Sequence, residues 1–179
     1  MAVRMTEMRQ IFLMRHAKSS WDEPDLDDFE RGLNNRGRKS ARLMAKYLAK
    51  AHIRPAMILC STAERTRATF AIIEPKLEGV PVSFENGLYE AAKGDLLDRL
   101  HQLDDHLASV MLIGHNPGME RLASCLCAGH GEAKALARLA EKFPTGALAV
   151  LETKAPRWAG LGAGDCRLVE FVLPGDLED

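Results

Sequence analysis

Short apolar stretches alternate along the chain with longer segments of helical spacing. Each stretch is four to six residues long and is soon followed by polar or turn residues, as expected for buried strands. Six stretches are candidate strands, and Val80–Phe84 is the weakest of them. The clear ones are Ile11–Met14, Met57–Cys60, Val110–Ile113, Ala147–Leu151 and Leu168–Leu173. Strands that alternate with helices predict βαβ units, and hence a three-layer α/β/α fold with a mostly parallel central sheet.

Two segments have one apolar face at helical spacing, and two others look like helix starts. Apolar residues recur every three or four positions from Ala41 to Ala51 and from Leu96 to Leu107. The segment 61–64 has the Ser-x-x-Glu pattern of a capping box, which places Arg65 in the first turn of a helix. Asn116-Pro117 predicts a further start, with the asparagine as N-cap and the proline at the first helical position.

Length and charge fit one globular domain. The chain has 179 residues, and we predict a single domain over 1–179 with a short N-terminal extension at 1–9. Lysine and arginine number 24 against 25 aspartate and glutamate residues, so no global field attracts nucleic acid or anionic lipid. No apolar run approaches the roughly 18 residues of a membrane span, and the first residues lack the apolar stretch of a signal peptide. We expect a cytoplasmic protein that binds neither nucleic acid nor membrane.

Basic side chains follow three of the predicted strands. Arg15 and His16 come directly after the first strand, Arg65 follows the second and His115 the fourth apolar stretch of the chain. Because the carboxyl ends of parallel strands meet at one side of a sheet, these side chains are expected to converge there. Helix N-termini and arginine forks both bind phosphate oxygens. The sequence therefore predicts an oxyanion site, with Asn116 as an additional phosphate-binding residue.

The sequence suggests no metal ion and no cofactor. A Gly-x-x-x-x-Gly-Lys-Ser/Thr loop is missing, and no carboxylates cluster in a way that suits magnesium. The cysteines are Cys60, Cys125, Cys127 and Cys166. Cys-x-Cys is not the usual zinc spacing, and no second pair exists. We expect the phosphate to be held by protein cations alone.

Three motifs, in this order, resemble the signatures of the histidine phosphatase superfamily, which has a phosphoglycerate-mutase-like fold. They are Leu13–Ser19, Ser61–Thr69 and Gly114–Gly118. Within the superfamily, the short chain, the Arg-His-Ala-Lys-Ser sequence and Lys142–Thr145 before a strand are most similar to the SixA-type phosphohistidine phosphatases. The resemblance extends from about Gln10 to Leu177.

The resemblance implies roles for five residues. His16 would be the nucleophile and would form a phosphohistidine intermediate that water hydrolyses. Arg15, Arg65 and His115 would bind the equatorial phosphoryl oxygens and stabilise their charge in the transition state. Family members that cleave esters use a carboxylic acid as proton donor, and Glu90 lies about where that residue is expected. Taken alone, Glu90 is equally typical of a solvated loop.

Other acidic residues follow the first motif. Larger family members have an asparagine six residues after the nucleophile, where this chain has Asp22. An ionised aspartate accepts hydrogen bonds but does not donate them, so we expect it to pair with Lys18 or Arg67. The stretch 22–30 as a whole is typical of a solvated loop, which at the mouth of the site would disfavour highly anionic small molecules.

These features predict a metal-independent phosphatase that acts on phosphohistidine in a protein. The length leaves little room for a capping insertion, which favours an open site that admits a protein surface. A phosphatase or mutase for small phosphorylated substrates is an alternative. A non-catalytic phosphate-binding module is another, although binding alone would not need His16.

Overall fold

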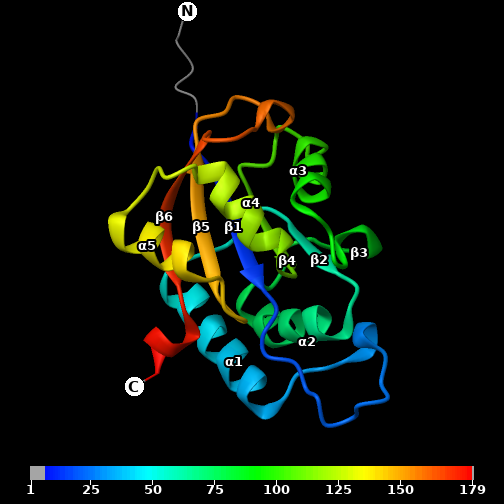
Figure 1. Cartoon of the computed structure of the whole chain (residues 1–179). Coiled ribbons are helices and arrows are strands. Elements are labelled where there is room, and N and C mark those ends of the chain that lie inside the picture. The colour runs from blue at the N-terminus through cyan, green and yellow to red at the C-terminus, as the bar shows by residue number, and fades with distance from the viewer. Residues whose placement is uncertain (1–6, 179) are drawn as a thin grey trace, which may run out of the picture.

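The computed structural model describes residues 7–178, which form a six-stranded sheet between two layers of helices (Figure 1). The strands are β1 (Arg9–Arg15), β2 (Ile58–Ser61), β3 (Val82–Glu85), β4 (Ser109–Gly114), β5 (Leu148–Thr153) and β6 (Cys166–Val172). Each of them overlaps one of the six predicted apolar stretches. All six strand predictions are therefore confirmed.

The strand order is β3-β2-β4-β1-β5-β6. The first four of these run parallel, whereas β5 pairs antiparallel with both β1 and β6. The sheet is thus mostly parallel, as predicted. The order also makes β2, β4 and β1 consecutive neighbours, which brings the three strands of the family motifs side by side.

Helices cover both faces of the sheet (Figure 1). They are α1 (Asn35–Lys50), α2 (Glu64–Ile73), α3 (Lys93–His101), α4 (Gly118–Cys127) and α5 (Ala133–Glu141). Short 3-10 turns complete the described elements: η1 (Asp28–Glu30), η2 (Glu74–Lys76), η3 (Asn86–Leu88), η4 (Trp158–Gly160) and η5 (Pro174–Leu177). Buried side chains of α1 and α2 form one core with the sheet, and those of α3, α4 and α5 form the other.

Strand β1 shows why its sequence is an unbroken apolar run. Ile11 and Leu13 enter the core under α3, α4 and α5, while Phe12 and Met14 enter the core under α1 and α2. Successive side chains of a strand point to opposite faces, and here both faces are buried. A strand covered on both sides has no position left for a polar residue.

The predicted capping box is wrong. Strand β2 continues through Ser61, and α2 begins at Glu64 with Ala63 as its N-cap. In a capping box the Ser61 hydroxyl would accept the main-chain N–H of Glu64. Here it accepts the N–H of Ala63 instead, at 3.3 Å. Arg65 nevertheless lies in the first turn of α2, as expected.

The start of α4 also differs by one residue from the prediction. The helix begins at Gly118 with Pro117 as its N-cap, so Asn116 lies just outside it. The Asn116 side-chain oxygen still accepts the N–H of Glu120 at 3.2 Å, which is a capping contact. Gly118 is required here, because a Cβ atom would come within 2.2 Å of the Ala91 carbonyl oxygen.

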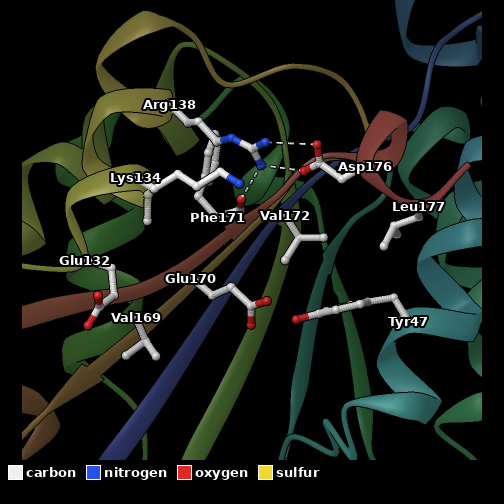
Figure 2. Close-up of a pocket in the computed structure, with 11 residues that line it drawn as sticks. Tyr47, Glu132, Lys134, Arg138, Val169, Glu170, Phe171, Val172, Asp176 and Leu177 are labelled. Carbon is white, nitrogen blue, oxygen red and sulfur yellow. Dashed lines mark hydrogen bonds and ion pairs between the residues drawn. The ribbon is translucent and has the colours of Figure 1, made fainter.

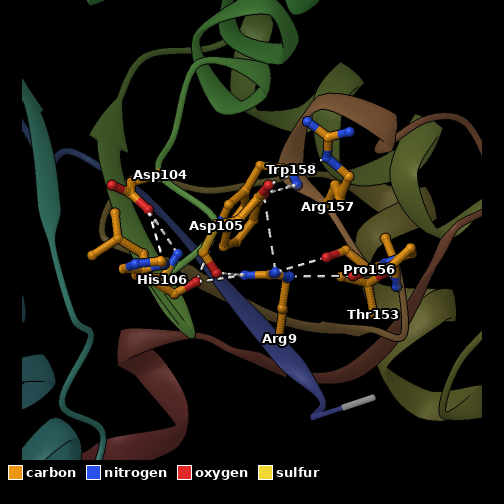
Figure 3. A network of polar contacts seen from close by, with 10 residues as sticks. Arg9, Asp104, Asp105, His106, Thr153, Pro156, Arg157 and Trp158 are labelled. Atoms are coloured by element: carbon orange, nitrogen blue, oxygen red, sulfur yellow. Dashed lines mark hydrogen bonds and ion pairs between the residues drawn. The ribbon is translucent and has the colours of Figure 1, made fainter. Parts of the chain in front are cut away.

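At the amino end of β1, Arg9 binds loops that are distant in sequence (Figure 3). Its guanidinium donates to the carbonyl oxygens of Asp105 (3.0 Å), Leu107 (2.7 Å), Ala155 (3.2 Å) and Pro156 (2.9 Å). Residues 1–6 of the predicted N-terminal extension lie outside the described residues, and Arg9, its last residue, already belongs to β1.

The fully buried Trp158 completes this network. Its ring lies 5.3 Å from the Arg9 guanidinium, and its indole N–H donates to the Leu107 carbonyl oxygen at 3.0 Å. The Asp105 carboxylate accepts the Trp158 main-chain N–H at 2.8 Å.

Within residues 7–178, no helix combines the length and the apolar character that crossing a membrane requires.

Candidate active site

The carboxyl ends of β1, β2 and β4 bring the predicted basic residues together. His16 follows β1, Arg65 lies in the first turn of α2 after β2, and His115 follows β4. The two imidazole rings are 5.3 Å apart between centroids. All three residues are buried, with exposed fractions of 6% for His16, 7% for Arg65 and 5% for His115.

The His16 ring is held by the main chain in one orientation. Its Nδ1 lies 2.7 Å from the carbonyl oxygen of Ala17. A carbonyl oxygen only accepts, so this hydrogen bond requires the ring proton on Nδ1 and leaves the Nε2 lone pair free. Burial, with Arg65 and Arg15 nearby, lowers the pKa of His16 to about 4. The ring is therefore neutral at pH 7, as a nitrogen nucleophile must be.

His115 is also neutral, and one of its nitrogens has no partner. Burial, followed by His16 and Arg65, lowers its pKa to about 3. Nε2 lies 2.8 Å from the hydroxyl oxygen of Ser61, which already accepts the N–H of Ala63. When the Ser61 hydroxyl donates to Nε2, the neutral ring carries its own proton on Nδ1. That Nδ1 is buried without a hydrogen-bond partner among the described residues.

Arg15 is hydrogen-bonded to the segment Lys142–Thr145, which is part of the resemblance to SixA-type phosphatases. Its Nη1 donates to the carbonyl oxygen of Phe143 at 3.0 Å. Burial lowers the pKa of Arg15, and its Nε is buried with no partner in residues 7–178. The site therefore holds two buried and unpaired nitrogens, one on an arginine and one on a histidine. Buried polar groups are normally paired, so this arrangement suits an anion that accepts from both.

Two other predicted residues lie differently. Asn116 donates its side-chain N–H to the Phe143 carbonyl oxygen at 3.0 Å and accepts from Glu120, so main-chain groups occupy both of its polar atoms. Glu90 is exposed, and its side chain makes no hydrogen bond or ion pair with any described residue. Its backbone has a φ of 52°, in the left-handed region. The roles expected for these two residues stay predictions.

Sequence reasoning missed Asp28, which contacts the site directly. Arg65 donates to the Asp28 carbonyl oxygen at 2.7 Å and to its carboxylate Oδ2 at 3.0 Å. The Tyr89 hydroxyl donates to the same Oδ2 at 2.6 Å. The hydrogen bond from Tyr89, reinforced by Arg65, lowers the pKa of Asp28, and the pKa of Tyr89 rises to about 12. Nothing in the acidic stretch 22–30 distinguishes Asp28 from its neighbours, because its partners follow it by 37 and 61 positions.

The expected partner of Asp22 is not found. No ion pair joins its exposed side chain to Lys18 or Arg67 in the part of the chain that the structure describes. In the same residues, no group of three or more histidine, cysteine, aspartate or glutamate side chains is placed to hold a metal ion.

A separate hollow of about 560 Å³ lies along the outer side of β6, with α5 and α1 as further walls (Figure 2). Arg138 spans it, donating to both carboxylate oxygens of Asp176 and to the Phe171 carbonyl oxygen. Strand β5 separates this hollow from β1. It lies apart from the group around His16.

Comparisons with known proteins agree with the geometry. A sequence model of the histidine phosphatase superfamily (branch 1) matches residues 11–121. An uncharacterized protein of Mycobacterium tuberculosis is 37% identical over 165 residues, which cover 90% of this chain and 99% of that protein.

Several solved structures that resemble this chain carry the SixA name. The protein named "putative phosphohistidine phosphatase SixA" from Agrobacterium tumefaciens superposes with a TM-score of 0.79 at 33% identity and covers 93% of this chain and 98% of its own. The protein histidine phosphatase SixA complexed with tungstate gives a TM-score of 0.76 at 24% identity and covers 94% and 99%, a likeness of fold alone.

Proposed function

Because the chain belongs to the histidine phosphatase superfamily, branch 1, we propose that it is a metal-independent phosphatase that removes the phosphoryl group from phosphohistidine in proteins. The observation that carries this proposal is the pair of buried, unpaired nitrogens, Arg15 Nε and His115 Nδ1, beside a neutral His16.

We also propose that the chain is one domain, because both hydrophobic cores pack against the same sheet.

The proposed reaction has two displacement steps at phosphorus. In the first, the Nε2 lone pair of His16 forms a bond to phosphorus in line with the leaving group, which departs with the electron pair of the broken bond. In the second, a water oxygen attacks the same phosphorus and the bond to Nε2 breaks. The water gives up one proton to the solvent, the products are inorganic phosphate and free His16 with its proton on Nδ1, and the enzyme is regenerated.

Three side chains are proposed to hold the phosphoryl oxygens. Arg15 would donate through Nε, His115 through Nδ1, and Arg65 through the N–H groups that do not point at Asp28. These donors are fixed before the substrate arrives, so they need no reorganisation as charge develops on the equatorial oxygens. A bound phosphate dianion would in turn favour protonation of His115.

The leaving group favours phosphohistidine over an alkyl ester. Imidazole has an unperturbed pKa of about 6.5 and can leave with its own proton near neutral pH, whereas an alkoxide must be protonated as it leaves. Glu90 is exposed, and its side chain makes no hydrogen bond or ion pair with a described residue. We therefore assign Glu90 a proton-donor role only for ester substrates. Similarity to the SixA protein of A. tumefaciens supports the same substrate class.

One screen tests the proposal. Turnover is compared on a phosphohistidine protein, a sugar phosphate and an aryl phosphate, each with and without prolonged treatment by a strong chelator. We expect the highest kcat/KM on the phosphohistidine protein and no effect of the chelator. Preference for the sugar phosphate would indicate a small-molecule phosphatase or mutase. Phosphate binding without turnover on any substrate would indicate a binding module, and activity restored only by a divalent ion would overturn metal independence.

A further inference from the structure

We propose that Asp28 is a positioning residue for Arg65: its carboxylate fixes the arginine fork toward the phosphoryl site and offsets part of its charge, so that phosphate is held less tightly and released sooner. This inference rests on the proposed function. It assigns a task to the one acidic side chain that is hydrogen-bonded to a proposed phosphate-binding residue in the described part of the chain.

Asp28 binds Arg65 through two different atoms. Nη1 of Arg65 donates to its carbonyl oxygen at 2.7 Å, and Nη2 donates to its carboxylate at 3.0 Å. The Arg65 side chain is 8% exposed, while that of Asp28 is 47% exposed. The carboxylate thus covers the outer side of the guanidinium. Two of the five N–H groups of the fork are used there, and three remain for a phosphoryl group.

The same carboxylate also sets the position of Tyr89. The Tyr89 hydroxyl donates to Asp28 Oδ2 at 2.6 Å, and the edge of its ring meets His115 with centroids 5.4 Å apart. The Arg65 guanidinium lies 5.8 Å from the Tyr89 ring centroid. Phe29, the next residue of η1, packs edge-on against Tyr89 at 5.0 Å. One turn of the chain thereby positions Tyr89, which neighbours two of the three proposed oxyanion donors, Arg65 and His115.

Charge gives the second half of the argument. Arg15 and Arg65 are the two cations near His16, and the carboxylate of Asp28 opposes their effect on both His16 and His115. A phosphate product carries up to two negative charges, and a carboxylate bound to one of its arginines repels it. Uniformly tight phosphate binding would slow release without helping the chemical step, whereas fixed donor geometry helps the transition state specifically.

The test is Asp28→Asn, with Asp27→Asn as its matched control. Both variants remove one negative charge from the same exposed loop, but no hydrogen bond or ion pair of a described residue involves the Asp27 side chain. The measurements are the Kd of orthophosphate and of tungstate by calorimetry, kcat and KM on the best substrate of the screen, and Tm. For Asp28→Asn we expect phosphate to bind about tenfold more tightly and kcat to fall about tenfold or more. For Asp27→Asn we expect changes within about twofold.

The opposite signs of the two effects separate this role from a merely structural one. A variant that loses phosphate affinity, kcat and Tm together would overturn the proposal, because Asp28 would then only hold the loop. Unchanged Kd and kcat would overturn it as well. Tyr89→Phe removes one hydrogen bond to the carboxylate but no charge, so kcat should fall while the phosphate Kd stays within about twofold.

The binding measurements also distinguish this proposal from the proposed function. If the wild type turns over no substrate, the phosphatase assignment fails. The phosphate Kd of Asp28→Asn then still decides the charge-offset role: tighter binding supports it, and an unchanged Kd overturns it.

Discussion

Arg9 begins β1 and Arg15 ends it, so one strand carries an arginine at each end of the sheet. Arg9 donates to four carbonyl oxygens from two distant loops (Figure 3). Arg15 donates to a single carbonyl oxygen and keeps a buried Nε without a partner among the described residues. All three guanidinium nitrogens of Arg9 are thus hydrogen-bonded, at a place where pairing serves stability. Where an arginine is left incompletely paired, a ligand is the simplest partner.

The same contrast extends to the neighbours of each arginine. Around Arg9, the Asp105 carboxylate and the Trp158 indole N–H are both hydrogen-bonded to the main chain. Around Arg15, His115 has an unpaired Nδ1 and His16 keeps a free Nε2 lone pair. Substitutions at the His16 end of the sheet should therefore lower activity, and substitutions at the Arg9 end should lower stability.

His16→Ala should have the largest effect. Removal of the nucleophile should lower turnover by at least about a thousandfold, while Arg15, Arg65 and His115 continue to bind phosphate. Turnover on the phosphohistidine protein and the Kd of phosphate are the two measurements. A variant that keeps even a tenth of the wild-type rate on every substrate would show that covalent catalysis by His16 is wrong.

Arg65→Lys should lower kcat/KM by about a hundredfold, because an ammonium group lacks the planar fork that matches two phosphate oxygens. The matched control is Arg99→Lys. Arg99 makes a two-point contact with Glu85, at 2.7 and 3.0 Å, and no hydrogen bond with a proposed phosphate-binding residue, so that variant should keep its activity within about twofold. Near-wild-type activity of the Arg65 variant would place this residue outside the reaction.

The acid limb of kcat/KM should lie near pH 4, because His16 must be neutral and its pKa is lowered to about 4. Protonation below that pH removes the lone pair, so activity falls as the pH drops. An ordinary histidine, with a pKa of about 6.5, would already cost about 30-fold at pH 5. A pH profile, corrected for the ionisation of the substrate, measures the limb. An NMR titration with His16→Ala for assignment measures the ring itself, and a midpoint near 6.5 would contradict the prediction.

Arg9→Met should act at the other end of the sheet. It keeps much of the apolar stem but removes a donor from four carbonyl oxygens, of which that of Leu107 retains the Trp158 indole N–H. This change should lower the free energy of unfolding by about 2 kcal/mol. Urea denaturation measures this loss, and kcat should stay within about twofold. Arg167→Met, which removes an exposed ion pair with Glu132, should cost less than about 1 kcal/mol. A large loss of kcat in the Arg9 variant would mean that the two ends of β1 are coupled.

Glu90→Gln should have the smallest effect on phosphohistidine, with a loss of less than about tenfold, because departing imidazole needs no external acid. On an alkyl phosphate the loss should reach about a hundredfold if Glu90 is the proton donor. The two rate ratios are compared on the same preparation. A large loss on phosphohistidine would contradict our account of the leaving group, and equal small losses on both would make Glu90 an ordinary loop residue.

Local pattern determined the elements and indicated the proposed site residues. A strand buried on both faces must be apolar throughout. Ile11–Met14 and the five other apolar stretches could therefore be predicted as strands before their pairing was known. The family motifs placed Arg15, His16, Arg65 and His115 at the ends of strands. The parallel pairing of β2, β4 and β1 puts those ends at one edge of the sheet, and the strand order makes them neighbours.

Tertiary structure alone decided which partners each polar atom has. In sequence, Ser61 is the first residue of a capping pattern. In the structure β2 extends through Ser61, and its hydroxyl oxygen lies 2.8 Å from Nε2 of His115, 54 positions later. Asp28 resembles every other acid of its loop until folding places Arg65 and Tyr89 beside it. Hydrophobic burial follows a short local period that a sequence displays, whereas a hydrogen bond depends on the positions of two atoms to within a few tenths of an ångström. That precision arises only when distant segments have packed together.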